Sequence, residues 1–140
     1  MSQRVRFDDV QVGETIPAFT APAVSRLQLA LFAGAAADHN PIHVDDAAAR
    51  GGGLLGVIAH GMLTMAFLGR LLTRWVPQQS IRSFSARFVA MALPGDVITC
   101  TGTVAAKSSE GGENRVELEL AAQNQKGEKI LVGKATVALS

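Results

Sequence analysis

The chain has 140 residues, close to the ~150 residues of an average domain, so the sequence excludes a multidomain machine and we expect one domain over residues 1–140. Hydrophobic residues make up 48% of the chain and charged residues 18%, which excludes intrinsic disorder and provides enough apolar material for a packed core. The formal net charge of +1 gives no support to a nucleic-acid-binding or polybasic membrane surface.

The sequence also indicates where the protein resides. Its one cysteine, Cys100, cannot form an internal disulfide, which fits a reducing compartment. Residues 1–14 lack the apolar core of a secretory signal. The longest apolar stretch, residues 54–69, contains His60 and is shorter than the roughly 20 residues of a membrane span. We therefore expect a soluble cytoplasmic protein that does not enter a membrane.

An extended segment, a helix and a loop are predicted at the start of the chain. Residues 4–20 have the pattern of extended edge structure. Residues 25–37 space their apolar side chains as a helix does, with Ser25 as the N-cap. Pro41 prevents this helix from running on, because proline lacks a backbone donor and disfavours the α conformation in the residue before it. Residues 38–46 are therefore expected to form a structured loop.

A longer helix is predicted at residues 62–76. A short helical turn at residues 45–50 and a glycine-rich stretch at residues 51–56 precede it. Its apolar side chains cover almost every face, which is typical of a helix in the interior of a protein. Pro77 follows its end.

Alternating apolar and polar residues predict strands in the second half of the chain. The alternation is found at residues 81–91, 97–106, 115–120 and 130–139. Turns rich in glycine separate the later segments, so we interpret them as consecutive antiparallel strands. Together with the long apolar helix they predict an α+β architecture in which the sheet wraps the helix.

The chemically useful side chains gather before the long helix, and metal binding is one interpretation of them. All three histidines lie between positions 39 and 60. His39 and His43 are four residues apart beside several carboxylates, a spacing that puts two ligands on one face of a helix. Pro41 breaks that helix, so we expect no metal site. We also expect no cofactor.

Two other interpretations of this segment stay open from the residues alone. In the first, Asp38 and Asn40 cap turns, Pro41 stiffens the loop and the histidines are structural. In the second, the Asp38 carboxylate and the His43 imidazole converge on one water molecule from the two sides of the proline turn and act as an acid–base pair.

A family resemblance favours the acid–base interpretation. The hexapeptide from Asp38 to His43, with the small residue Ala47 after it, resembles the signature of the MaoC-like, or (R)-specific, enoyl-thioester hydratases and dehydratases, including bacterial hydroxyacyl-ACP dehydratase subunits. Similarity to the family extends over essentially the whole chain. It includes residues 7–14, 59–64, 87–88 and 94–96.

One residue departs from the family pattern. Many members have glycine or another residue that is not alanine immediately before the aspartate, and here Ala37 stands at that position. The change leaves the identities of Asp38 and His43 intact. We expect it to bear on substrate size or on the choice of partner.

The resemblance implies a fold and an activity. The fold is the hot dog, in which a curved antiparallel sheet wraps a long central helix, and two such units usually pair as a homodimer or a heterodimer. The activity is the reversible hydration of a trans-2-enoyl thioester to an (R)-3-hydroxyacyl thioester, carried by CoA or by acyl carrier protein (ACP). Two alternatives are a hot dog acyl thioesterase and the catalytic subunit of a heterodimeric hydroxyacyl-ACP dehydratase.

The resemblance also implies roles for individual residues. Asp38 and His43 are the catalytic pair that holds the water, with Asp38 as proton acceptor, and either residue could protonate carbon 2. The backbone N–H of Gly61, at the start of the long helix, is the expected oxyanion donor. The other residues assigned to substrate binding are Asn40, His60 and Met62, of which His60 fits a structural role better than a catalytic one, since Asp38 and His43 already supply the pair.

Overall fold

The computed structural model describes residues 4–140. The first three residues of the predicted domain, and of the segment that lacks a secretory signal, lie outside the described residues. Within residues 4–140, no helix is both long and apolar enough to cross a membrane. In chain order the elements are η1 (Phe7–Asp9), β1 (Phe19–Thr20), α1 (Arg26–Ala35), η2 (Pro41–His43), α2 (Asp46–Gly51), α3 (Gly61–Trp75), η3 (Gln78–Ser80), β2 (Ile81–Phe88), β3 (Thr99–Glu110), β4 (Glu113–Gln123) and β5 (Lys129–Leu139).

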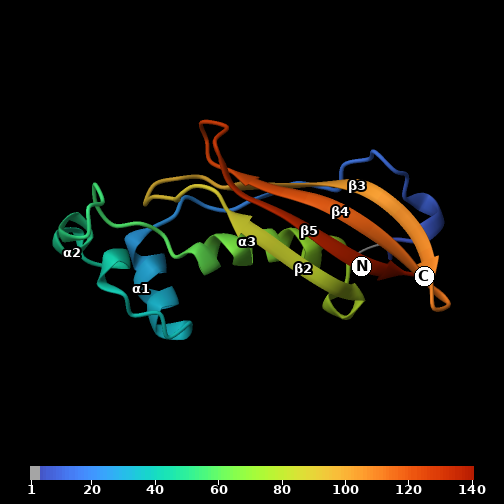
Figure 1. The fold of residues 1–140 in the computed structure, drawn as a ribbon, viewed down its shortest axis with the longest axis horizontal. Coiled ribbons are helices and arrows are strands. Elements are labelled where there is room, and N and C mark those ends of the chain that lie inside the picture. Colours follow the sequence, from blue (N-terminus) through green and yellow to red (C-terminus); the bar gives the residue numbers. More distant parts are fainter. Residues whose placement is uncertain (1–3) are drawn as a thin grey trace.

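The five strands form one antiparallel sheet that curves around α3 (Figure 1). The strand order is β1-β3-β4-β5-β2. β3, β4 and β5 are a meander, as the alternation predicts. The prediction that all the strands are consecutive neighbours is wrong for β2, which pairs with β5 at the far edge. Residues 89–98 contain no strand and carry the chain away from β2 before β3 begins, whereas a tight hairpin would need only a few residues.

The core lies between α3 and the inner face of the sheet. Alternate strand residues that point toward α3 are buried, among them Cys100, Val104, Leu118 and Val137. On the helix, Leu68, Leu71 and Leu72 are fully buried. Burying one such side chain contributes about 1.5–3 kcal/mol, so this contact stabilises the sheet in its curved form.

The long helix is buried on one face only. The sequence predicts a helix surrounded on every side, but Met62 is 56% exposed, and Ala66 and Arg70 are also exposed. The exposed side chains share the face that points away from the sheet. α3 is therefore the inner layer of a two-layer arrangement and has one free face within residues 4–140.

The helices α1 and α2 lie at one end of the molecule, beyond the end of the sheet (Figure 1). The Ser25 Oγ accepts a hydrogen bond of 3.0 Å from the backbone N–H of Gln28, so the predicted N-cap of α1 is confirmed. Asp46 joins three segments, because its carboxylate accepts from the backbone N–H of Val57 and pairs with Arg26 of α1. The Val57 N–H and the Arg26 guanidinium lower the pKa of Asp46.

Candidate active site

The loop after α1 is shaped by a residue with an unusual backbone conformation. Ala37 has φ of 54°, in the left-handed region that favours glycine, and turns the chain so that Asp38 follows directly. Asn40 then caps η2, since its Oδ1 accepts a hydrogen bond of 3.2 Å from the backbone N–H of Ile42. Pro41 begins η2, where its missing N–H costs nothing.

His43 ends η2 with its ring buried and its tautomer fixed. Its Nδ1 lies 2.8 Å from the backbone carbonyl oxygen of Ile58. A carbonyl only accepts hydrogen bonds, so Nδ1 must carry the proton and donate it. In the neutral ring the other nitrogen, Nε2, then holds a lone pair.

That lone pair faces Asp38. His43 Nε2 and Asp38 Oδ2 are 3.7 Å apart, which is too long for a direct hydrogen bond. The His43 side chain is 9% exposed and that of Asp38 is 47% exposed, so the pair lies at the boundary between the protein interior and solvent. Two acceptors at this separation can each receive one hydrogen of a single bridging water molecule.

His60 lies directly behind the pair. Its ring stacks on that of His43, with centroids 3.8 Å apart and planes inclined by 24°. Its Nε2 is 3.3 Å from the backbone carbonyl oxygen of Asp38, and its Nδ1 is buried with no hydrogen-bond partner among the described residues. Burial is the main cause that lowers the pKa of His60.

These three residues are also the group that could hold a metal ion. Asp38, His43 and His60 each offer a ligand atom, and the atoms lie within 4.8 Å of one another. The histidine rings are stacked, so their nitrogen lone pairs lie in nearly parallel planes and do not converge on one ion. His39, which the sequence paired with His43 as a candidate ligand, is exposed and is not part of this group.

The start of α3 supplies backbone donors next to the pair. The His60 carbonyl accepts from the N–H groups of Leu63 and Thr64, and no side chain caps the helix. The first N–H groups of a helix, here those of Gly61 and Met62, have no partner within it and lie at the positive end of its dipole. Phe88 packs against Gly61 from β2.

The residues predicted to form the site therefore come together around the junction of η2 and α3. The exception is Met62, whose side chain lies on the exposed face of α3. Sequence reasoning did not identify Ile58 or Phe32. Ile58 contributes a main-chain carbonyl, which any residue could supply, so the sequence holds no signal for it. Phe32 meets the ring of His60 edge-on, with centroids 4.9 Å apart. The sequence predicted the helix that carries Phe32 but not what that helix packs against.

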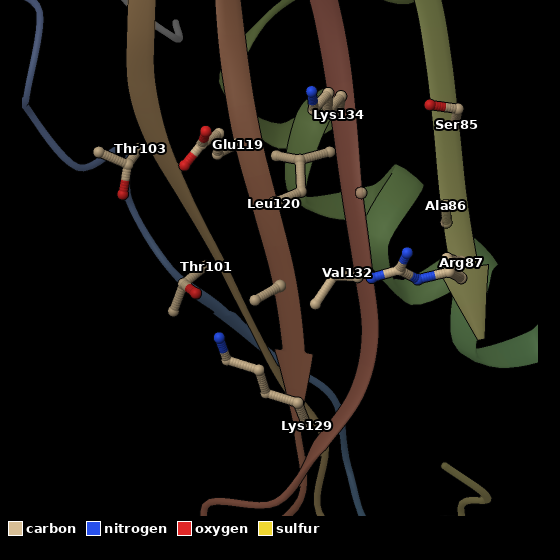
Figure 2. A pocket seen from close by; sticks show the side chains of 12 residues that line it. Ser85, Ala86, Arg87, Thr101, Thr103, Glu119, Leu120, Lys129, Val132 and Lys134 are labelled. Atoms are coloured by element: carbon tan, nitrogen blue, oxygen red, sulfur yellow. The ribbon is translucent and has the colours of Figure 1, made fainter. Parts of the chain in front are cut away.

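One cavity adjoins this junction, and a second lies on the sheet away from it. One, of about 870 Å³, is lined largely by apolar side chains and includes Ile58 and Phe88. The other, of about 580 Å³, lies on the outer face of the sheet, with α3 behind the strands (Figure 2). Lys129, Lys134 and Arg87 line this outer cavity, and neither Asp38 nor His43 is part of its lining.

Comparison with known proteins identifies relatives of this fold and site. The chain is 34% identical over 100 residues to an (R)-specific enoyl-CoA hydratase of Rhodospirillum rubrum, over 70% of this chain and 68% of the relative. It is 38% identical over 116 residues to a fatty acid synthase subunit beta of Aspergillus oryzae, over 79% of this chain and only 6% of that far longer relative.

The solved structures support the same relationship. R-hydratase PhaJ1 from Pseudomonas aeruginosa superimposes with a TM-score of 0.85 at 25% identity, covering 97% of this chain and 86% of that chain. The fold is thus a hot dog. The sequence model of the MaoC like domain matches residues 4–128. The chain therefore belongs to the MaoC-like dehydratase family.

Proposed function

We propose that this protein is a hydro-lyase that interconverts a trans-2-enoyl thioester and an (R)-3-hydroxyacyl thioester. The observation that carries the proposal is the 3.7 Å separation of His43 Nε2 and Asp38 Oδ2, two acceptors that face each other where the site opens. The names of the relatives agree with this chemistry, since one is an (R)-specific enoyl-CoA hydratase.

The two catalytic residues would act on one water molecule. His43 Nε2 and the Asp38 carboxylate each accept one of its hydrogens, which aims the oxygen lone pair at carbon 3 of the substrate. As the oxygen bonds to carbon 3, Asp38 takes one proton and the other stays on the new hydroxyl group. The proton that Asp38 took passes on to carbon 2, directly or through His43 Nε2, so the net change is the addition of one water molecule and the pair ends in its starting charge state.

Negative charge that develops on the thioester oxygen needs a donor. The Gly61 N–H at the start of α3 is our proposed donor, because it has no intrahelical partner and lies at the positive end of the helix dipole. Asn40 serves the substrate by capping η2 and so ordering the loop. Met62 follows Gly61 and is 56% exposed, so its side chain is free to contact the acyl chain of a bound substrate outside the buried part of the site.

The apolar cavity beside Ile58 and Phe88 suits the hydrocarbon part of the substrate, and at about 870 Å³ it is large enough for one. The carrier is either CoA or ACP. Cys100 is buried as a free thiol, which agrees with a reducing cytoplasm as the site of the reaction. We propose neither a nucleic acid nor a membrane as a partner of this protein.

We further propose that the protein pairs with a second hot dog subunit, identical or related. β2 is an edge strand, bonded only to β5 in the described sheet. Apolar side chains near that edge are exposed, including Phe88, Val89 and Met91 at 49%, 47% and 54%. An unpaired edge with adjacent apolar surface favours association with another sheet. Native mass measurement and co-purification would distinguish the homodimer from the heterodimer.

The activity is tested with enoyl-CoA substrates of increasing chain length and with 3-hydroxyacyl-ACP, together with chiral analysis of the product. We expect loss of the enoyl absorbance on hydration and formation of the (R) product. Asp38→Asn and His43→Gln should each lower kcat by about 10²–10⁴, the usual contribution of one acid–base group. The matched control is His39→Gln, an exposed histidine in the same loop, which should keep full activity.

Other outcomes would contradict the proposal. Release of free thiol without loss of the double bond would instead identify a thioesterase. Full activity in Asp38→Asn or in His43→Gln would refute the role of that residue. Absence of activity toward every CoA and ACP substrate, alone and with a co-purified partner, would refute the hydro-lyase assignment.

A further inference from the structure

The ring of His60 occupies the centre of the site without reaching its surface. It is 0% exposed and lies between two other rings. Phe32 of α1 meets it edge-on at a centroid distance of 4.9 Å, and His43 stacks on it at 3.8 Å. A fully enclosed side chain cannot touch a substrate unless its neighbours move, so the position of His60 favours a role exerted through those neighbours.

His60 contacts both members of the catalytic pair. Its face lies against the His43 ring, and its Nε2 lies 3.3 Å from the main-chain carbonyl oxygen of Asp38. Because that carbonyl can only accept, the proton of the neutral ring is on Nε2. His60 is also the N-cap residue of α3, so one residue joins the aspartate loop and η2 through its ring and the helix that presents Gly61 through its main chain.

The remaining nitrogen of His60 explains why the ring stays neutral. Nδ1 is buried with no partner within the described residues, so a proton there would leave a buried donor unsatisfied and a charge in a closed site. The titratable groups packed against the ring are Asp38 and His43, and α1 presents only the hydrocarbon ring of Phe32. Burial lowers the pKa of His60 accordingly. A neutral ring does not compete with Asp38 or His43 for the reacting proton.

We infer that His60 is a positioning residue: by stacking on His43 and bonding to the Asp38 main chain, it fixes the two groups at the separation that holds the water. This inference rests on the proposed function. A positioning role differs from direct substrate binding, because a change at His60 should then lower kcat and leave the affinity for the substrate nearly unchanged. Displacing reacting groups by about 1 Å can cost about 10² in rate.

Two variants separate the contacts of His60. His60→Phe keeps a flat ring between Phe32 and His43 but removes the donor to Asp38. His60→Gln keeps an N–H donor but removes the ring. We expect each to lower kcat by about 10- to 100-fold with KM changed by less than about threefold. The control, His39→Gln, should match wild type, and circular dichroism and the urea midpoint establish that each variant is folded.

A double-mutant cycle tests whether His60 acts through His43. In the His43→Gln background, His60→Gln should change kcat by less than about twofold, since the ring on which His60 stacks is gone. An equal loss in both backgrounds would overturn the inference and indicate an independent role in the fold. A rise in KM with unchanged kcat would overturn it in favour of direct substrate contact.

A measurement without substrate separates this inference from the proposed function. In ¹⁵N-labelled wild type, NMR should show His43 as a single tautomer protonated at Nδ1. In folded His60→Gln the His43 ring loses the stacking that holds it against the Ile58 carbonyl, so its signals should shift toward averaged tautomers. An unchanged His43 spectrum would overturn the inference, even in a protein that proves inactive toward enoyl and hydroxyacyl thioesters.

Discussion

Gly61 and Phe88 are packed so closely that a side chain on Gly61 would crowd the Phe88 ring. A Cβ built on Gly61 would lie 3.0 Å from Cε1 and 3.2 Å from Cδ1 of the Phe88 ring. Phe88 is the last residue of β2, so the strand at the edge of the sheet forms a wall against the first residue of α3. Space therefore favours glycine here, and in the proposed mechanism the missing side chain also leaves the Gly61 N–H open to the substrate.

Gly61→Ala should lower both stability and activity. The added methyl group must displace the Phe88 ring, and overpacking of this kind costs about 1 kcal/mol or more. It also narrows access to the Gly61 N–H, so kcat/KM should fall by at least about tenfold, toward the loss of about 10²–10³ seen when an oxyanion donor is removed. Urea unfolding and enoyl-CoA hydration measure the two effects.

Gly69→Ala is the matched control on the same helix. Its Cβ would lie 3.4 Å from the Phe84 ring, an ordinary contact, and alanine is a better helix former than glycine by about 1 kcal/mol. This variant should be at least as stable as wild type and fully active. Adding Phe88→Leu to Gly61→Ala should restore stability, and failure to do so would contradict the packing argument.

Ala37→Gly should stabilise the protein. Ala37 has φ of 54°, and an alanine there costs about 1–2 kcal/mol that glycine does not pay. Glycine gives back about 0.4–1 kcal/mol through the greater freedom of the unfolded chain, so we expect a net gain of about 0.5–1 kcal/mol. The measurement is the free energy of unfolding in urea.

The control for this change is Ala35→Gly, at the last residue of α1. There the backbone is helical, and glycine should destabilise by up to about 1 kcal/mol. Two alanines two positions apart are thus expected to respond with opposite signs. A loss of stability in Ala37→Gly would mean that the left-handed conformation at this residue carries no strain.

The sequence predicts contacts between residues close together in the chain better than contacts between distant segments. Ser25 caps α1 through a bond to Gln28 only three residues away, and this local pattern was predicted correctly. Alternation placed Cys100 and Val104 on the buried face of β3, because alternation reports which face a side chain takes. It does not report which strand lies alongside, so β2 was assigned the wrong neighbour.

The site shows the same division. The resemblance brought Asp38, His43 and Gly61 to attention by identity, and the structure places them around one junction. The contacts that orient them come from the Ile58 main chain and from ring stacking on His60. Those contacts join residues about fifteen or more positions apart through backbone groups or ring faces, and residue spacing carries no information about either.

Stability should fall in acid partly because of Glu113. Hydrogen bonds from the guanidinium groups of Arg82, and then of Arg115, lower the pKa of Glu113 from 4.5 to about 2. A group whose pKa is lower in the folded state stabilises the fold above its unfolded pKa and loses that contribution as the pH falls through its folded pKa. The contribution should thus be complete above about pH 4.5 and gone near pH 2.

The measurement is urea unfolding of wild type and Glu113→Gln from pH 7 to pH 2. The difference in unfolding free energy should be constant above about pH 4.5 and shrink steadily below it. Because the carboxylate side chain is 31% exposed, added salt should reduce the difference at pH 7. A difference that persists unchanged to pH 2 would show that the ion pairs with Arg82 and Arg115 do not hold the carboxylate ionised.

Cys100 should be inert in the folded protein. It is 0% exposed on the inner face of β3, and burial raises the pKa of its thiol to about 12, which suppresses the reactive thiolate. Ellman's reagent at pH 8 should therefore modify no thiol in the native state and one per chain in urea, since the chain has one cysteine.

The control is Ala105→Cys in a Cys100→Ala background, which places the thiol at an exposed position of the same strand and should react at once without urea. Because reaction of Cys100 requires opening of the core, its native rate should rise with urea in parallel with unfolding. Fast modification of native wild type would mean that β3 opens far more easily than its place inside the sheet, between β1 and β4, implies.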